Sequence, residues 1–225
     1  MQLRKATARG AGVMGVAALL VSMLHLPPAS AEQCPPAKIR ILPSYEAPQG
    51  FAYAPGEELG TAPGPDHEVL GVIETSVGWD VDVGIRQRCR GEKCELCVNR
   101  VKGKAGFEPG RTRVTDRFRG DACRTDAVLA HEARHSQVFD ESTRAGVRTI
   151  VIALTRWAAV QTALVATPET VEAAAQTKYA EVEEVMREGV ASIEREARTR
   201  NERIDNPRAY EAEREEMERR CRESR

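Results

Sequence analysis

The sequence is poor in aromatic residues, in histidine and in long apolar runs. Phe, Trp and Tyr make up 4% of its 225 residues, so a core must take its volume from Val, Leu, Ile and Ala. Only residues 11–26 form a long apolar run, and no other stretch is apolar enough to span a bilayer. Of four histidines, three follow this run: His67, His131 and His135. The composition therefore argues against a bundle of membrane spans.

Residues 1–31 have the pattern of an export signal: a basic start, an apolar core too short for a stable span, and an Ala-Ser-Ala cleavage signature ending at Ala31. A retained membrane anchor is the alternative.

The mature chain, 32–225, is expected to be one domain in the bacterial envelope, periplasmic or secreted. It divides into a β-rich part, 32–120, and a helical part, 121–225. Without the signal its formal net charge falls from −1 to −4, and nothing indicates a basic face for nucleic acid.

Six cysteines follow the signal. They are Cys34, Cys89, Cys94, Cys97, Cys123 and Cys221. An even number in an exported chain favours disulfides, although the sequence does not choose among the pairings. Cys89, Cys94 and Cys97 also match the C-x4-C-x2-C spacing of plant-type iron–sulfur proteins, an alternative that an oxidising compartment disfavours. Cys221 is expected to tie the last helix to the body of the protein.

The first part of the mature chain has the features of β structure. Between 73 and 85 the odd positions are all apolar except Thr75, which is typical of a strand with one buried face. This run is long for one strand, so we expect a bend at Gly78 or Gly84. Asp80 and Asp82 then lie on the solvent face rather than in a metal site. Further strands are expected at 38–41, 95–102 and 111–115, and an irregular connection at 43–66.

The second part is helical. From 126 to 164 there is no proline and one glycine, and apolar residues recur at helical spacing. Thr167-Pro168 and Asn206-Pro207 are cap-and-proline signals, so two further helices are expected to begin there. The predicted fold class is α+β: a small antiparallel sheet, then a long antiparallel helical hairpin, then a short C-terminal helix.

The chemistry of the sequence is concentrated in His131-Glu132-x-x-His135. On an α-helix, residues four apart share one face, so His131 and His135 can point two imidazole nitrogens at one ion. Glu132 follows about 100° round the helix, within reach of a water on that ion. This pattern is typical of zinc hydrolases, in which the carboxylate takes a proton from that water.

The alternative interpretation is two surface histidines on a charged helix. The flanks argue against it, because apolar residues precede the motif at 128–130 and follow it at Val138 and Phe139. Thr125 is the expected N-cap of this helix. The motif is short enough to occur by chance, so the metal site is a hypothesis at this point.

A catalytic zinc site needs a third protein ligand and an open position. Asp140 falls nearly opposite the metal face of the helix and Glu141 well off it. No glycine ends the helix after the second histidine, since Val138 stands there. An antiparallel hairpin brings the end of the second long helix to the motif instead. Asp205 is favoured as the third ligand. Glu202 comes second, because the apolar stripe of the second long helix directs Glu202 away from the first.

With the export signal, the strands and the His-Glu-x-x-His helix, the chain resembles a bacterial family of uncharacterised proteins described as predicted secreted zinc-dependent proteases. The likeness runs through Thr75, Trp79 and Val81 on one strand, Cys97 on the next, and Leu129-Ala130-His131-Glu132-x-x-His135. The family carries a Tyr-Asp…His-Gly tract near its C-terminus. This chain has Ile204-Asp205-Asn206-Pro207 there and no histidine. The resemblance implies peptidase activity, and the departure leaves the third ligand open.

We therefore expect an exported zinc-dependent metallohydrolase, in particular a peptidase, with His131 and His135 as zinc ligands and Glu132 as general base. An exposed strand edge beside the helix would hold an extended peptide or protein substrate. One alternative is a non-catalytic envelope protein whose helical hairpin binds a partner, with incidental or stored zinc. Another is a metallohydrolase of peptidoglycan cross-links. The substrate and the oligomeric state do not follow from the sequence.

Overall fold

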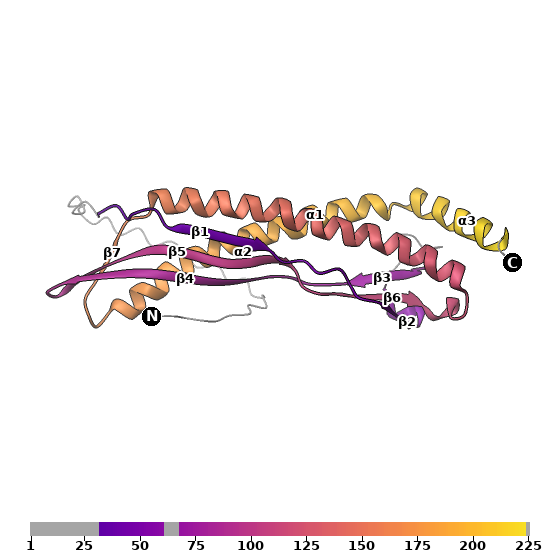
Figure 1. Cartoon of the computed structure of the whole chain (residues 1–225), viewed down its shortest axis with the longest axis horizontal. Helices are drawn as coiled ribbons and strands as arrows, with labels where there is room; N and C mark the ends of the chain where they lie inside the picture. The colour runs from indigo at the N-terminus through magenta and orange to yellow at the C-terminus, as the bar shows by residue number, and fades with distance from the viewer. Residues whose placement is uncertain (1–31, 61–67, 224–225) are drawn as a thin grey trace, which may run out of the picture. The chain divides into compact units, whose positions relative to one another are not determined.

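A computed structural model describes residues 32–60 and 68–223 (Figure 1). The expected export signal and His67 lie outside the described residues. Within the described part, no helix has the length and apolar character needed to cross a membrane. The chain divides into two compact units. Of the described residues, one unit contains 32–40, Asp80–Gly103 and Val151–Val185, and the other contains 41–60, 68–79, Lys104–Ile150 and 186–223.

The α+β class is confirmed. The strands are β1 (Lys38–Pro43), β2 (Phe51–Ala54), β3 (Gly71–Glu74), β4 (Val77–Arg90), β5 (Lys93–Phe107), β6 (Arg111–Thr115) and β7 (Leu164–Ala166). The helices are α1 (Ala122–Val160), α2 (Val171–Ile204) and α3 (Pro207–Glu223), with short 3-10 turns η1 (Gly56–Glu58) and η2 (Asp116–Phe118).

The strands form two sheets rather than the one antiparallel sheet that we expected. In the first sheet β1, β5 and β4 lie side by side, and β7 also pairs with β5 (Figure 1). In the second sheet the order is β2-β6-β3, with β2 parallel and β3 antiparallel to β6. Strand β2 lies in the Pro- and Gly-rich stretch that was expected to be irregular.

The strand expected over 73–85 is interrupted, but at Thr75 and Ser76 rather than at Gly78 or Gly84. The Thr75 hydroxyl donates a hydrogen bond to the Glu108 carbonyl at 2.6 Å. The Glu108 amide in turn donates to the Ser76 carbonyl at 2.8 Å. These bonds end β3 and start β4, so the alternating pattern continues through a change of sheet.

The helix starts match the sequence signals in one case of three. Asn206 caps α3, since its side-chain oxygen accepts from the Ala209 amide at 3.0 Å. Helix α1 begins earlier than expected, because Asp121 accepts from the Arg124 amide at 3.1 Å. Thr125 is instead buried inside the first turns. Helix α2 begins at Val171 rather than after a Thr167 cap, because residues 167–170 form a turn.

Two glycines let α1 and α2 pack closely where both run through the second unit. A Cβ atom on Gly146 would stand 2.1 Å from Cγ1 of Ile193. A Cβ atom on Gly189 would stand 2.2 Å from Cγ1 of Ile150. Each helix therefore offers a glycine to the isoleucine of the other. As expected, α1 continues without a break past Val138.

All six cysteines are oxidised, which excludes the iron–sulfur alternative. The disulfides are Cys34–Cys97, Cys89–Cys94 and Cys123–Cys221. Three disulfides agree with an extracytoplasmic protein. As expected, Cys221 ties the last helix down, and its partner lies in the first turn of α1.

Further contacts hold α3 against the start of α1. Met217 is buried beside Phe118 and Val128. The Arg124 guanidinium donates to Glu218 through Nε at 3.0 Å. Helix α3 is thus held by a covalent bond, a small apolar cluster and an ion pair, and its side chains project beside the His-Glu-x-x-His motif.

Candidate metal centre

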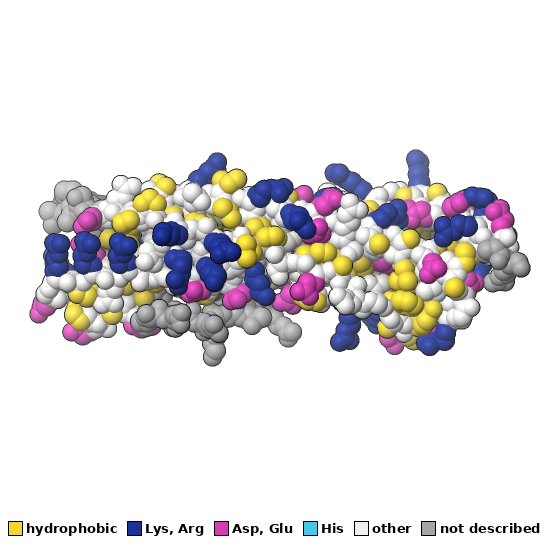
Figure 2. Space-filling model, viewed as in Figure 1, with side chains coloured by type: hydrophobic (Ala, Val, Ile, Leu, Met, Phe, Trp, Pro, Cys, Tyr) yellow, Lys and Arg dark blue, Asp and Glu magenta, His cyan; other side chains and the backbone are white. Residues whose placement is uncertain are grey.

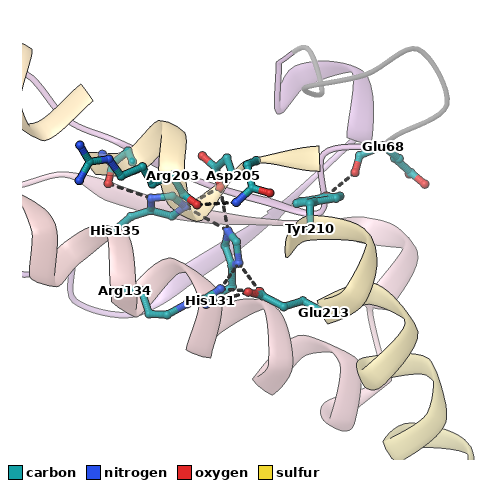
Figure 3. Close-up of polar contacts among 10 residues, drawn as sticks. Glu68, His131, Arg134, His135, Arg203, Asp205, Tyr210 and Glu213 are labelled. Atoms are coloured by element: carbon teal, nitrogen blue, oxygen red, sulfur yellow. Dashed lines mark hydrogen bonds and ion pairs between the residues drawn. The ribbon is translucent and has the colours of Figure 1, made fainter. Parts of the chain in front are cut away.

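Three segments of the second unit meet at the motif (Figure 3). Helix α1 contributes His131, Glu132 and His135. Asp205 lies at the junction between α2 and α3, just after the last residue of α2. Because Pro207 opens a new helix there, the chain turns at Asp205 and the carboxylate is directed at the two imidazoles rather than along α2.

The two imidazoles and the Asp205 carboxylate form a nearly equilateral triangle of donor atoms. The Nε2 atoms of His131 and His135 are 3.0 Å apart. Oδ1 of Asp205 lies 3.1 Å from the first and 3.0 Å from the second. Within the described residues, these three side chains form the group of His, Cys, Asp or Glu residues suited to holding a metal ion.

This triangle is close to the size that zinc requires. With Zn–N and Zn–O bonds of about 2.0–2.1 Å, tetrahedral ligand atoms stand about 3.3 Å apart. The observed separations of 3.0–3.1 Å need to open by only about 0.3 Å, by comparison with that geometry. Two imidazoles and one carboxylate are also a donor set that zinc accepts, and three ligands leave a fourth position open.

The other ring nitrogen of each histidine meets an oxygen acceptor. Nδ1 of His131 lies 2.8 Å from Oε2 of Glu213, which projects from α3 on the other side of the ring (Figure 3). The Arg134 guanidinium lies against both Glu213 and this nitrogen. Nδ1 of His135 lies 3.0 Å from Oδ1 of Asn201. Donation from each Nδ1 leaves Nε2 as the ring nitrogen that can give up the proton shared with Asp205 and offer its lone pair to a metal.

Burial and pairing shift the pKa values of these groups in opposite directions. Burial alone lowers the pKa of His131, but hydrogen bonds to Asp205 and Glu213 outweigh it and raise the pKa. Burial likewise lowers the pKa of His135, and bonds to Asp205 and Asn201 outweigh it. For Asp205 burial raises the pKa, but the two imidazoles hold it well below its usual range. A metal ion that binds here must therefore displace protons.

Glu132 differs from the other carboxylates of the site. Its side chain is buried, with the residue 4% exposed. Burial raises its pKa, and the nearby histidines offset only part of that effect. A Cβ atom on Gly71 would stand 2.8 Å from Oε1 of Glu132, so the carboxylate packs directly on the backbone of β3. A carboxylate with a raised pKa is suited to accept a proton.

A cavity of about 390 Å³ opens beside the metal centre. Its polar residues include His131, Glu132, His135, Asp205 and Tyr210. The rest of its wall is mainly apolar and comes from the end of η1, the β3 region, α1 and α3: Leu59, Val69, Leu70, Val72, Ile73, Ala127, Val128, Phe139 and Met217. An apolar cavity with a few converging polar groups is the usual form of a small-ligand or substrate site.

The structure brings together the residues that the hairpin argument favoured. Asp205 lies beside both histidines, whereas Glu202 is exposed and outside the cluster. Asp140 pairs with Arg144 at 2.9 Å, one turn along α1 and away from the motif. Glu141 pairs with Arg200. The acids adjacent in sequence are thus engaged elsewhere.

Sequence reasoning missed the groups that support the histidines. Glu213 lies in an Arg- and Glu-rich helix where nothing in the pattern distinguishes it from its neighbours. Asn201 lies on a similar charged stretch of α2. Tyr210 packs its ring edge-on against His131, with centroids 6.2 Å apart, and its hydroxyl donates to the Glu68 carbonyl. Only the folded positions of α2 and α3 beside the motif identify these residues.

Comparisons of the chain with protein-family models, with curated proteins and with solved structures found no match.

Proposed function

We propose that the chain is an exported zinc-dependent metallohydrolase, in particular a peptidase. The observation that carries this proposal is the triangle of His131, His135 and Asp205 donor atoms, with the buried carboxylate of Glu132 beside it on the same cavity. Three protein ligands with an open fourth position characterise catalytic zinc, whereas structural zinc usually has four protein ligands. The resemblance to predicted secreted zinc-dependent proteases points to the same activity, with Asp205 in the tract where that family has a histidine.

Zinc, when bound, would lower the pKa of a coordinated water to about 7 and polarise the scissile carbonyl. His131 and His135 would bind the ion as neutral imidazoles, each oriented through its Nδ1. Glu132 would accept a proton from the water while the oxygen of the water bonds to the carbonyl carbon. The same proton would pass to the amine nitrogen as the C–N bond breaks. The raised pKa of Glu132 suits both steps.

The geometry of β3 supports a peptide as substrate. In the antiparallel pair of β3 with β6, the Thr115 amide donates to the Leu70 carbonyl. Two residues further along β3, Val72 is the partner of Arg113. Residues 70 and 72 therefore point their backbone groups at β6, while Gly71 and Ile73 point theirs to the other edge. Within the described residues no strand pairs with that edge. An extended peptide added there would run past Glu132.

The test begins with metal content. Purified residues 32–225 should retain about one zinc per chain after dialysis, and His131→Ala should lose it while staying folded. Glu132→Gln should keep the zinc and lose about 100- to 10,000-fold in turnover of a quenched fluorescent peptide library, as expected for a missing general base. Full activity after chelation would overturn the proposal. Zinc binding with no turnover of peptide or peptidoglycan substrates would favour the storage alternative.

A further inference from the structure

The sheet of β1, β5 and β4 has one apolar face and one basic face in the first unit. Inward-facing Cys94 and Leu96 of β5 are buried against Ala174 and Ala175 of α2. Along β4 the residues of the opposite face become exposed and basic towards the end of the strand. They are Arg86, Arg88 and Arg90. Helices therefore cover one face of the sheet, and the other carries a row of guanidinium groups.

Strands β5 and β1 add cations to the same face. On β5, Asn99 and Arg100 are both exposed, while Val98 and Val101 on either side are buried, so an extra residue shifts the alternation there. The exposed cations of β5 and β1 in this unit are Lys93, Arg100, Lys102, Lys38 and Arg40. Figure 2 shows Lys and Arg side chains gathered over these strands. We call Lys38, Arg40, Arg86, Arg88, Arg90, Lys93, Arg100 and Lys102 the basic face.

The basic face has few acids to balance it. Among the described residues on this side of the sheet and at its turn, the acids are Asp80, Asp82, Glu92 and Glu95. Of the eight cations, Arg100 forms an ion pair, with Asp82 at 3.1 Å. The chain as a whole has a formal net charge of −1. The expectation that the protein has no basic face is therefore wrong, because cations scattered through the sequence come together only in the sheet.

We propose that the basic face binds the surface of an anionic lipid bilayer. Its cations are spread over three adjacent strands rather than along one line, which suits a surface of many phosphate groups. None of its outward positions carries an aromatic side chain, and such side chains are what single-stranded nucleic acids stack on. Cys34–Cys97 and Cys89–Cys94 lie in the same unit, and disulfides persist outside the cytoplasm, where the protein meets membrane surfaces.

This contact would be peripheral and electrostatic. Each Lys or Arg near an anionic bilayer strengthens binding by about fivefold. The effect falls off within a Debye length of about 10 Å at 0.1 M salt. The basic face would hold the protein at a membrane without a spanning segment and would let it leave when the ionic strength rises.

The test is co-sedimentation of residues 32–225 with phosphatidylcholine vesicles that contain or lack phosphatidylglycerol. Binding should require phosphatidylglycerol and should disappear between about 0.05 M and 0.5 M salt. Arg86→Glu/Arg88→Glu/Arg90→Glu should weaken it by at least about 100-fold. A second variant, Lys38→Glu/Arg40→Glu, should weaken it by at least about 25-fold. Thermal melting would show that both variants fold.

A matched control reverses three exposed arginines elsewhere, Arg195→Glu/Arg208→Glu/Arg220→Glu, with the same change of net charge. It should bind vesicles nearly as the parent chain does. Equal binding by the β4 variant and the parent would overturn the proposal. Binding to a DNA duplex but not to the vesicles would also overturn it and would assign the face to nucleic acid. Zinc content, which should be the same in every variant, tests the metallohydrolase proposal separately.

Discussion

Oε2 of Glu213 lies 2.8 Å from Nδ1 of His131, opposite the ring nitrogen that faces Asp205. Glu213 belongs to α3, and α3 is tied to the start of α1 by Cys123–Cys221. The orientation of a candidate ligand on α1 is therefore set by a helix that begins 76 residues after it in the sequence.

Glu213→Gln should weaken zinc binding by about 10- to 100-fold, because the carboxylate that accepts from Nδ1 of His131 fixes the tautomer and raises the basicity of that histidine. Competition with a chelating dye measures the change. Glu211→Gln, two residues away and exposed, is the matched control and should bind zinc normally. Unchanged zinc affinity in Glu213→Gln would mean that His131 does not depend on this contact.

Asp205→Ala should lose most zinc binding and keep its far-ultraviolet circular dichroism spectrum, because it removes a ligand at a helix junction rather than a core residue. Asp140→Ala removes an exposed ion pair with Arg144, a type of pair that contributes little. It should therefore leave zinc binding intact. If Asp140→Ala alone strips the metal, the assignment of the third ligand is wrong.

The effect of zinc on stability should grow as the pH rises. In the metal-free chain the pKa values of His131 and His135 are raised above the unfolded value of about 6.5. Their pairing with Asp205 therefore stabilises the fold fully below about pH 6.5 and is lost as the pH rises through the folded pKa values. Zinc needs the neutral imidazoles and gains affinity over that same range.

Thermal melting with and without zinc, at several pH values between about 5.5 and 8, measures this dependence. The zinc-induced rise in Tm should be smallest at the acidic end. Ionised Asp205 affects stability only at lower pH. Because its pKa is lowered in the fold, its contribution to the free energy of unfolding is lost only as the pH falls below about 4. A zinc effect that does not change with pH would contradict histidine ligation.

Gly146→Ala should destabilise the protein by about 1–3 kcal/mol, although alanine is the better helix former. The new methyl group would meet Ile193 across the helix pair. Chemical denaturation measures the loss. Adding Ile193→Ala removes the obstructing atoms, so the double variant should be more stable than the sum of the single effects predicts. Strict additivity would show that the two residues are not in contact.

The sequence was most informative where the chemistry is local. The spacing of His131 and His135 on a helix, the continuation of that helix past Val138 and the cap at Asn206 all depend on neighbours within a few residues. The choice of Asp205 used one long-range assumption, an antiparallel hairpin. The contacts of His131 with Asp205 and of His135 with Asn201 confirm the antiparallel arrangement. The residues opposite the two histidines differ from the expected ones by only a few positions along the second helix.

The rest depends on contacts between distant segments. The break at Thr75 and Ser76 could not be read from alternation, because the odd positions stay apolar on both sides of it. It is made by Glu108, more than 30 residues away. The role of Glu213 could not be predicted either, because α3 carries many similar glutamates and only the contact with His131 distinguishes this one.

Every residue assigned to the metal centre, from His131 to Glu213, lies between Cys123 and Cys221 in the sequence. The disulfide closes that stretch into a covalent ring that contains both candidate histidines, Asp205 and the residues that orient them. One cut in the backbone of the ring would leave a single molecule, with all these groups still linked. For a chain proposed to cut peptides, a single cut within this ring would leave the candidate zinc ligands and Glu132 joined in one molecule.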